Sequence, residues 1–384
     1  MTAALSRDEI TTINQPIGNA SGLPNRAYTS KEFFELERDA LFSNNWTCIG
    51  HACSMAQAGD VLPIDLMGIP LVALRNTKDE IKVFHNVCSH RGNQLVWEAC
   101  SGKKVITCPY HAWSYDLKGN LVGTPHIGGY GKHQAEGFDK AKHGLCEVRS
   151  FVWMDLVFIN LAENQPDFDE YIRPLEERVF TLAAREEFER LKPATSHGTL
   201  ELNLSSNWKL CIENNLESYH LPWVHPDLNS ISKLEDHYHF YIDDLCAGQG
   251  SETYDPDRDG LVEFPKYTNW CDRKAEYPTL FPNVFLGFQY DHFWSIVIEP
   301  IAPNRTREKL QLYYLSDGAQ RDEYEPTRKS QLESWTKVFN EDVGVVEGMH
   351  RGRGSPAFNG GVFSPEMDKP THFFHKWVAR KMAV

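Results

Sequence analysis

The chain has 384 residues, a formal net charge of −14, 41% hydrophobic residues and nine cysteines. This length is enough for two or more domains with substantial cores. The acidic balance disfavours a nucleic-acid-binding surface, and no apolar run reaches the roughly 18 residues of a membrane-spanning helix. The cysteines are mostly scattered, and the polar start has no hydrophobic region before a cleavage site. We therefore expect free thiols in a cytoplasmic protein.

The first 44 residues are expected to form a helical segment that packs on the C-terminal domain. The sequence Thr-Ser-Lys-Glu at 29–32 has the form of a capping box, with Thr29 at the start of a helix. An apolar series follows it, made of Phe33, Phe34, Leu36, Leu41 and Phe42.

The pattern then changes to short β-rich runs separated by turn signals, such as Leu-Lys-Gly-Asn at 117–120. The clearest runs lie at 61–64, 70–74, 81–84 and 157–161. They predict a small antiparallel β domain over 45–162.

Two loops of this domain each carry one cysteine and one histidine. Cys88 and His90 stand in Cys-Ser-His-Arg-Gly, and Cys108 and His111 stand in Cys-Pro-Tyr-His-Ala-Trp. Two thiolates and two imidazoles are the ligands of a Rieske [2Fe–2S] cluster, in which the cysteines bind one iron and the histidines the other. A structural zinc site is the alternative. Zinc loops usually pair like ligands, whereas each loop here holds one of each kind, so we favour the redox cluster.

The residues around these ligands resemble the cluster loops of Rieske non-haem iron oxygenases. Respiratory Rieske proteins carry one more cysteine in each loop, and a disulfide joins the two. The matching positions here are Gln94 and Tyr110. No such bridge is therefore expected.

The charged stretch 163–192 is expected to be a helical connector, and 193–384 an α+β domain. The pattern predicts strands over 200–204, 293–301 and 309–315 and helices over 206–220 and 325–350. No strand is followed by Gly-x-Gly-x-x-Gly and a helix, so the sequence does not predict a nicotinamide or flavin site of the Rossmann type. Electrons are therefore expected from an external reductase or ferredoxin.

The segment 213–225, Glu-Asn-Asn-Leu-Glu-Ser-Tyr-His-Leu-Pro-Trp-Val-His, gives the best indication of catalysis. On a helix, Glu213, Glu217 and His220 would share one face. Pro222 disfavours helical geometry at the preceding residue, so the helix is expected to end near His220. The turn that follows would bring His225 beside His220 to form an iron site. A coincidental pair of histidines is the alternative.

A third ligand candidate, Asp342, stands in line with an apolar stripe of the helix predicted over 325–350. A carboxylate at such a position is normally paired or bound to a metal. An ion pair with Arg351 or Arg353 is one reading. We favour a facial triad of two histidines and one carboxylate, because this non-haem iron arrangement leaves positions open for dioxygen. The stripe contains Leu332, Trp335, Phe339, Val346 and Met349.

Over nearly its whole length the sequence resembles the large, catalytic α subunit of Rieske ring-hydroxylating oxygenases. One motif on which the resemblance rests is Asn-Trp-Lys at 207–209, followed by Glu-Asn-x-x-Glu-x-Tyr-His-x4-His at 213–225. The other is Glu-Asp at 341–342, followed by Val-Glu-Gly-Met-His-Arg-Gly at 346–352.

This resemblance implies that His220, His225 and Asp342 bind a mononuclear non-haem iron(II), and that Glu217 and Asn214 are catalytic residues. It implies a Rieske antiparallel β domain joined to a helix-grip, Bet v1-like catalytic domain with an antiparallel sheet and helices. It also implies a homotrimer, or a multiple of three, in which the cluster of one chain faces the iron of the next.

Glu217 occupies a position where many family members have an aspartate that bridges two subunits. The longer glutamate is expected to accept from Nδ1 of His220 and from His111 of the neighbouring subunit. Such a carboxylate would fix the imidazole tautomer and connect the two redox sites. The alternative makes Glu217 a ligand of a di-iron bundle, but that needs a second Glu-x-x-His motif, and we find none.

The region 264–294 is rich in aromatic residues, most of them expected in the strand core and some in the substrate pocket. An aromatic wall suits a flat ring and a quaternary ammonium group equally well. Glu217 resembles the carnitine and betaine branch of the family.

The expected function is a terminal oxygenase that uses O2 and a partner's electrons to hydroxylate a small organic substrate, most generally an aromatic ring or aromatic acid. A monooxygenase of the betaine, choline or carnitine type is the alternative. A Rieske electron-transfer protein without oxygenase activity is the alternative from another class.

Overall fold

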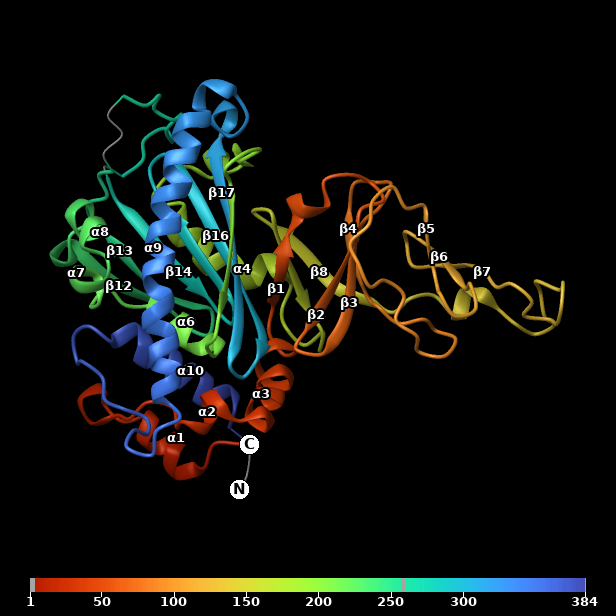
Figure 1. Ribbon diagram of the computed structural model, residues 1–384, viewed down its shortest axis with the longest axis horizontal. Helices are drawn as coiled ribbons and strands as arrows, with labels where there is room; N and C mark the ends of the chain where they lie inside the picture. The colour runs from red at the N-terminus through yellow and green to blue at the C-terminus, as the bar shows by residue number, and fades with distance from the viewer. Residues whose placement is uncertain (1–3, 257–259, 272, 384) are drawn as a thin grey trace. The chain divides into compact units, whose positions relative to one another are not determined.

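The computed structural model describes residues 4–256, 260–271 and 273–383. The chain forms two compact units (Figure 1). The discontinuous unit comprises Met1–Thr47 and Asn164–Val384, and the inserted unit comprises Cys48–Glu163. The finer division at 1–44, 45–162, 163–192 and 193–384 stays a prediction, and its residues 1–3, 257–259, 272 and 384 lie outside the described ones. Among the described residues, no helix has both the length and the apolar character needed to span a bilayer.

The inserted unit is built on a six-stranded sheet in the order β1-β9-β8-β4-β3-β2 and a three-stranded sheet in the order β5-β6-β7. Strands predicted at 61–64, 70–74, 81–84 and 157–161 are confirmed as β2, β3, β4 and β9. The bounds are β1 Thr47–His51, β2 Val61–Leu66, β3 Ile69–Arg75, β4 Ile81–His85, β5 Val105–Thr107, β6 Ser114–Asp116, β7 Leu121–Gly123, β8 Glu147–Trp153 and β9 Leu156–Asn160.

The discontinuous unit is built on an eight-stranded sheet in the order β10-β17-β16-β15-β14-β13-β12, and β11 also pairs with β17. Every pairing is antiparallel. Strands predicted over 200–204, 293–301 and 309–315 are confirmed as β11, β16 and β17. The bounds are β10 Leu191–Pro193, β11 Thr199–Leu204, β12 His237–Ile242, β13 Cys246–Ser251, β14 Ala275–Leu280, β15 Val284–Phe288, β16 His292–Ala302 and β17 Arg305–Leu315.

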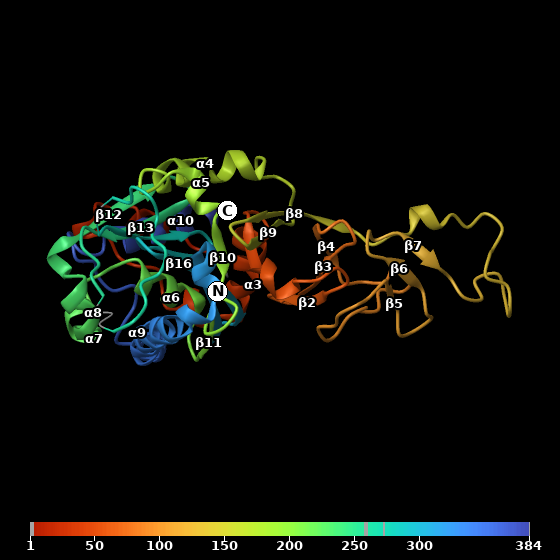
Figure 2. The same cartoon turned by 90° about the horizontal axis from the view of Figure 1, so that it is seen from above.

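Helices cover this sheet. The long α9, predicted over 325–350, is confirmed and runs along one face (Figure 1), while α4 and α5 lie on the other side (Figure 2). The bounds are α1 Arg7–Ile13, α2 Arg26–Thr29, α3 Lys31–Glu37, α4 Phe168–Val179, α5 Arg185–Phe188, α6 Trp208–Asn215, α7 Leu221–Val224, α8 Pro226–Ile231, α9 Glu325–Gly352 and α10 Lys369–Lys381.

The predicted capping box is wrong by one residue. The N-cap of α3 is Ser30, whose hydroxyl accepts the backbone N–H of Phe33 at 3.1 Å. Thr29 is instead the last residue of α2. Both residues have hydroxyls suited to a cap, so the sequence alone did not separate them.

The helix predicted over 206–220 is wrong in its second half, because α6 ends at Asn215. The Glu217 carboxylate accepts the backbone N–H groups of Tyr219 and His220, which competes with helical hydrogen bonding. Pro222 then lies in the first turn of α7, where a missing N–H costs nothing. Glu217 and His220 therefore do not lie on the face of α6.

A buried ion pair ties the N-terminal segment to α6. The side chains of Glu37 and Lys209 are both fully buried and form a salt bridge. The Lys209 ammonium also donates to Oδ1 of Asn207 at 2.7 Å, and Nε1 of Trp208 donates to Glu37 at 3.0 Å. Removal of one partner from such a pair leaves a buried charge without compensation.

The variant Lys209→Met is therefore expected to lower the free energy of unfolding by about 3–5 kcal/mol. Lys369→Met removes a lysine from an exposed pair with Glu366 and should cost less than about 1 kcal/mol. Urea denaturation followed by circular dichroism measures both. Equal, small losses in the two variants would show that the buried pair does not hold the segment.

Candidate active site

The two Cys–His loops of the inserted unit are closed by matching backbone hydrogen bonds. The N–H of Gly92 donates to the carbonyl of Cys88 at 2.9 Å, and the N–H of Ala112 donates to that of Cys108 at 3.0 Å. Both closing residues have a positive φ, 72° at Gly92 and 55° at Ala112. A glycine adopts this conformation without steric cost. The two loops thus close in the same way, four residues after their cysteines.

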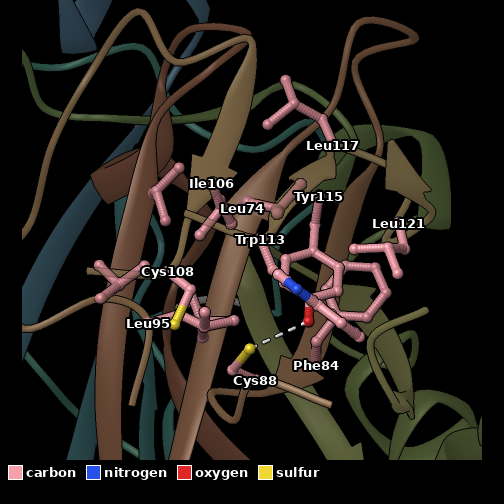
Figure 3. Close-up of a cluster of buried hydrophobic side chains, with 13 residues drawn as sticks. Leu74, Phe84, Cys88, Leu95, Ile106, Cys108, Trp113, Tyr115, Leu117 and Leu121 are labelled. Atoms are coloured by element: carbon pink, nitrogen blue, oxygen red, sulfur yellow. Dashed lines mark hydrogen bonds between the residues drawn. The ribbon is translucent and has the colours of Figure 1, made fainter. Parts of the chain in front are cut away.

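The two thiols are buried in an apolar cluster (Figure 3), and each cysteine is 2% exposed. The sulfur of Cys88 lies 3.2 Å from the hydroxyl of Tyr115. The imidazole centroids of His90 and His111 are 4.6 Å apart, and Trp113 stacks on His90. The two cysteines therefore share one core cluster, and the two histidines lie side by side.

The donors fit a two-iron cluster better than a single zinc ion. Three zinc ligands would have to converge on one point. Among the described residues, ligand atoms of three such side chains lie within 4.8 Å of one another only in His220, His225 and Asp342. Three of the four loop residues do not converge in this way. The Nδ1 atom of His111 is also buried and has no hydrogen-bond partner in the described structure. A role as an iron ligand would explain a buried nitrogen that has no hydrogen-bond partner.

The second group of donors assembles in the discontinuous unit. His220 immediately precedes α7, His225 immediately follows it, and Asp342 lies on α9. Oδ1 of Asp342 is 3.0 Å from Nε2 of His225 and 3.6 Å from Nε2 of His220. The short helix α7, rather than a turn alone, brings the two histidines together. Three donors on one side suit a metal with open coordination positions.

Each imidazole is oriented by its own glutamate. Glu217 lies 2.6 Å from Nδ1 of His220, and Glu341 lies 2.8 Å from Nδ1 of His225. With Nδ1 occupied, both rings turn Nε2 toward Asp342. Asn214 donates to Oδ1 of Asp342 at 3.1 Å. Sequence reasoning missed the role of Glu341, although it stands in the quoted motif, because neighbouring residues of a helix point in different directions.

Neither arginine considered as a partner of Asp342 pairs with it in the described structure. Arg353 pairs with Glu213 at 3.4 Å, and Arg351 is exposed. Glu213 also accepts from Tyr28 and lies 3.0 Å from Nε2 of His375, in a separate buried network. Glu213 is therefore not part of the group formed by His220, His225 and Asp342, which is called the metal group below.

The metal group attracts positive charge. Burial would lower the pKa of His225, but the hydrogen bonds and charges of Asp342 and Glu341 raise it overall. A divalent cation would satisfy the same carboxylates.

A cavity of about 80 Å³ opens at the metal group. Three of its aromatic lining residues come from the region 264–294, and the other two belong to the stripe of α9 on which Asp342 lies. They are Tyr277, Phe285, Trp294, Trp335 and Phe339. The stripe read from the sequence as core thus also forms one wall of the cavity.

Hydrogen bonds hold the two tryptophans in place. Nε1 of Trp335 donates to Nε2 of His292 at 3.0 Å, and Nδ1 of His292 lies 2.7 Å from Asp291. Nε1 of Trp294 donates to the Gln289 side-chain oxygen at 3.2 Å when the amide takes the orientation that satisfies both its ends. The indole N–H groups are therefore used by buried partners, and both rings line the cavity.

Gly287 makes room for the Trp294 ring. The two residues are opposite one another in the β15–β16 pair, and a Cβ on Gly287 would lie 2.0 Å from the indole. The Trp294 centroid is 5.4 Å from those of Trp335 and Phe339. These rings form a preorganised aromatic wall.

Sequence reasoning missed the polar residues of the cavity, which include Glu308, His237 and Gln249. Nδ1 of His237 is 3.0 Å from Oε1 of Gln249, whose amide donates to the carbonyls of Asn215 and Glu217. Burial, with a smaller contribution from Asp342, raises the pKa of Glu308 to about 7. Strand alternation could have placed Glu308 on the inner face with Leu310.

Comparison with known proteins gives counterparts for both units. Residues 191–384 match the family described as the ring hydroxylating alpha subunit (catalytic domain), and residues 45–135 match the Rieske [2Fe-2S] domain. The carnitine monooxygenase oxygenase subunit of Acinetobacter pittii is 28% identical over 88% of this chain and 86% of its own length. The glycine betaine monooxygenase oxygenase subunit of Pseudomonas aeruginosa is 31% identical over 94% of this chain and 89% of its own length.

The fold has a counterpart among solved structures as well. A crystal structure of the quaternary ammonium Rieske monooxygenase CntA matches with a TM-score of 0.79 and 24% identity, over 97% of this chain and 98% of that one. The predicted α+β architecture, with a Rieske β domain and an antiparallel catalytic domain, is confirmed. The chain belongs to the ring-hydroxylating Rieske oxygenases, as a catalytic α subunit that serves as a terminal oxygenase with a Rieske [2Fe–2S] cluster and a mononuclear non-haem iron.

Proposed function

We propose that the protein is a monooxygenase of a quaternary ammonium compound. The observation that carries this proposal is the wall of Trp294, Trp335 and Phe339 beside the metal group, with both indole N–H groups turned to buried partners. Aromatic rings that line a cavity attract an ammonium group by cation–π interaction. The carnitine and glycine betaine oxygenases among its relatives support the same substrate class. This is the alternative reading of the sequence, not the aromatic-ring reading.

In this proposal Cys88, His90, Cys108 and His111 hold the cluster, and the metal group of His220, His225 and Asp342 holds the iron. Together the two centres supply single electrons and dioxygen activation. One oxygen atom enters a C–H bond next to the nitrogen, and the other leaves as water with two electrons and two protons. The hydroxylated carbon then separates from nitrogen, which gives an aldehyde and an amine.

The chain's own residues supply position and orientation. Glu217 and Glu341 hold the two imidazoles at Nδ1, Asn214 steadies Asp342, and the aromatic wall holds the ammonium group. Fixed ligands and a fixed wall keep the reacting carbon in one place.

We further propose a homotrimer, or a multiple of three, that receives electrons from an external reductase or ferredoxin. Glu217 would then link His220 to His111 of the neighbouring copy. Large aromatic residues exposed near both positions support a contact here: Trp223 is 72% exposed and Tyr219 46%, while Tyr110 beside His111 is 59% exposed. Exposed apolar surface of this kind is typical of protein contacts.

The variant Asp342→Ala is expected to lose the mononuclear iron and oxygenase activity, because two imidazoles alone bind the metal weakly. The visible absorbance of the cluster should remain. Cys108→Ser should show the reverse, with loss of the absorbance. Iron analysis with absorption spectroscopy measures both. Retention of all iron and turnover in Asp342→Ala would show that another residue is the third ligand.

Glu217→Gln is expected to keep both metal centres but to slow cluster reoxidation in a single turnover by about tenfold or more. The amide cannot accept from both imidazoles as a carboxylate does. Glu341→Gln is the matched control, because it alters the same kind of bond at His225 without touching the link to the neighbour. Loss of iron in Glu217→Gln would make Glu217 a ligand instead.

The substrate class is tested by oxygen uptake with a surrogate reductase. Choline, glycine betaine, L-carnitine and tetramethylammonium are compared with benzoate and salicylate. We expect at least one ammonium compound to stimulate uptake and to yield an aldehyde. Trp335→Leu should raise its KM by about tenfold or more, since a desolvated cation–π contact contributes about 2 kcal/mol. Trp270→Leu, outside the cavity lining, is the control. Turnover of the aromatic acids alone would contradict the proposal.

A further inference from the structure

We propose that Glu308 is the counter-ion for the substrate's ammonium group, and that the preferred substrate is a cation without a carboxylate, such as a choline-type alcohol or a small methylammonium compound. Zwitterions of the betaine and carnitine kind would bind less well. This inference rests on the proposed function and specifies the substrate within it.

Glu308 is a buried carboxylate without a cation. It is 8% exposed and lies on β17, opposite Ile298 of β16 and Leu202 of β11. The nearby thiol of Cys211 lowers the pKa of Glu308, but burial has the larger effect and raises it. Within the described structure it forms no ion pair. A carboxylate in apolar surroundings is costly unless it is protonated or a positive charge accompanies it, and a cation in the cavity would favour its charged form.

Glu308 faces the same space as the aromatic wall. Trp294 is opposite Leu312 in the β16–β17 pair, and Leu312 is four residues from Glu308. Because side chains alternate along a strand, Trp294, Leu312 and Glu308 point to one face of the sheet. Both Trp294 and Glu308 line the cavity. An ammonium group there would lie in a space lined by both the aromatic wall and a carboxylate.

The charges of the cavity lining favour a cation. Among its described residues are three carboxylates, Glu217, Glu308 and Asp342, and neither lysine nor arginine. Glu217 is engaged with His220, and Asp342 with the metal group. Burial lowers the pKa of His237, so this imidazole stays neutral. Glu308 is therefore the carboxylate left for a ligand.

The same inventory disfavours a zwitterion. A substrate carboxylate would enter a cavity whose described lining offers it no guanidinium or ammonium partner. Two imidazoles and one carboxylate would leave a divalent iron with one net positive charge, which would repel the ammonium group of either kind of substrate. Glu308 offsets that repulsion for a simple cation.

Anaerobic titration calorimetry of the holoenzyme tests this without turnover. The ligands are choline, its neutral carbon isostere 3,3-dimethylbutanol, and glycine betaine. In the wild type, choline should bind at least about tenfold more tightly than either, which corresponds to about 1.4 kcal/mol. Glu308→Gln keeps the size of the side chain and removes its charge. It should weaken choline binding by at least about tenfold and leave the affinity for the isostere unchanged.

Two further variants separate charge from structure. Glu308→Asp keeps the charge and should retain part of the preference for choline over the isostere. Glu201→Gln changes an exposed carboxylate on the neighbouring β11 and should bind all three ligands as the wild type does. If Glu308→Gln is misfolded by circular dichroism, the wild-type ranking and Glu308→Asp still decide the question.

The outcomes distinguish the two proposals. The role of Glu308 would be overturned if glycine betaine bound as tightly as choline, or if a folded Glu308→Gln kept the preference for choline. Oxidation of any ammonium compound would still uphold the proposed function. Neither binding nor oxidation of any ammonium compound would overturn both. If Glu308→Gln loses the preference for choline over its isostere, the result supports Glu308 as the counter-ion.

Discussion

The geometry of the catalytic end depends on the face that α9 turns toward the sheet. Residues spaced four and three apart on a helix lie one above another, so Trp335, Phe339 and Asp342 share that face. One helix therefore delivers both an aromatic wall and a carboxylate for the metal group. A rotation that preserved the apolar packing but moved Asp342 away would separate substrate binding from the metal. The strict periodicity of the stripe prevents it.

This helix could be predicted from the sequence because its periodic pattern is long, and packing reinforces it. The segment 206–220 could not, although its apolar positions are also helical. Glu217 offers its carboxylate to the backbone of Tyr219 and His220, and this local competition ends α6 early. The histidines were still correctly expected to meet, because the spacing of His220 and His225 allows it through α7 as well as through a turn.

The rest of the site depends on contacts between distant strands and helices, which no local pattern reports. His292 begins β16, yet its importance comes from Trp335 on α9. Gln249 on β13 supports the backbone of Glu217. Glu308 looks like one more charge on a strand until its neighbours across the sheet are known. Such residues become recognisable only when burial and partners are both specified, because the same residue types are common on exposed surfaces.

The division of the chain has a consequence for biosynthesis. All strands of the inserted unit exist once Asn160 has been made, so a ribosome-bound chain holds the complete set of cluster loops early. The sheet and helices around the iron need segments from both ends of the polypeptide, and Glu37 must wait for Lys209 before its charge is matched. Because domains fold as units during translation, the electron-receiving part can mature first and the oxygen-handling part last.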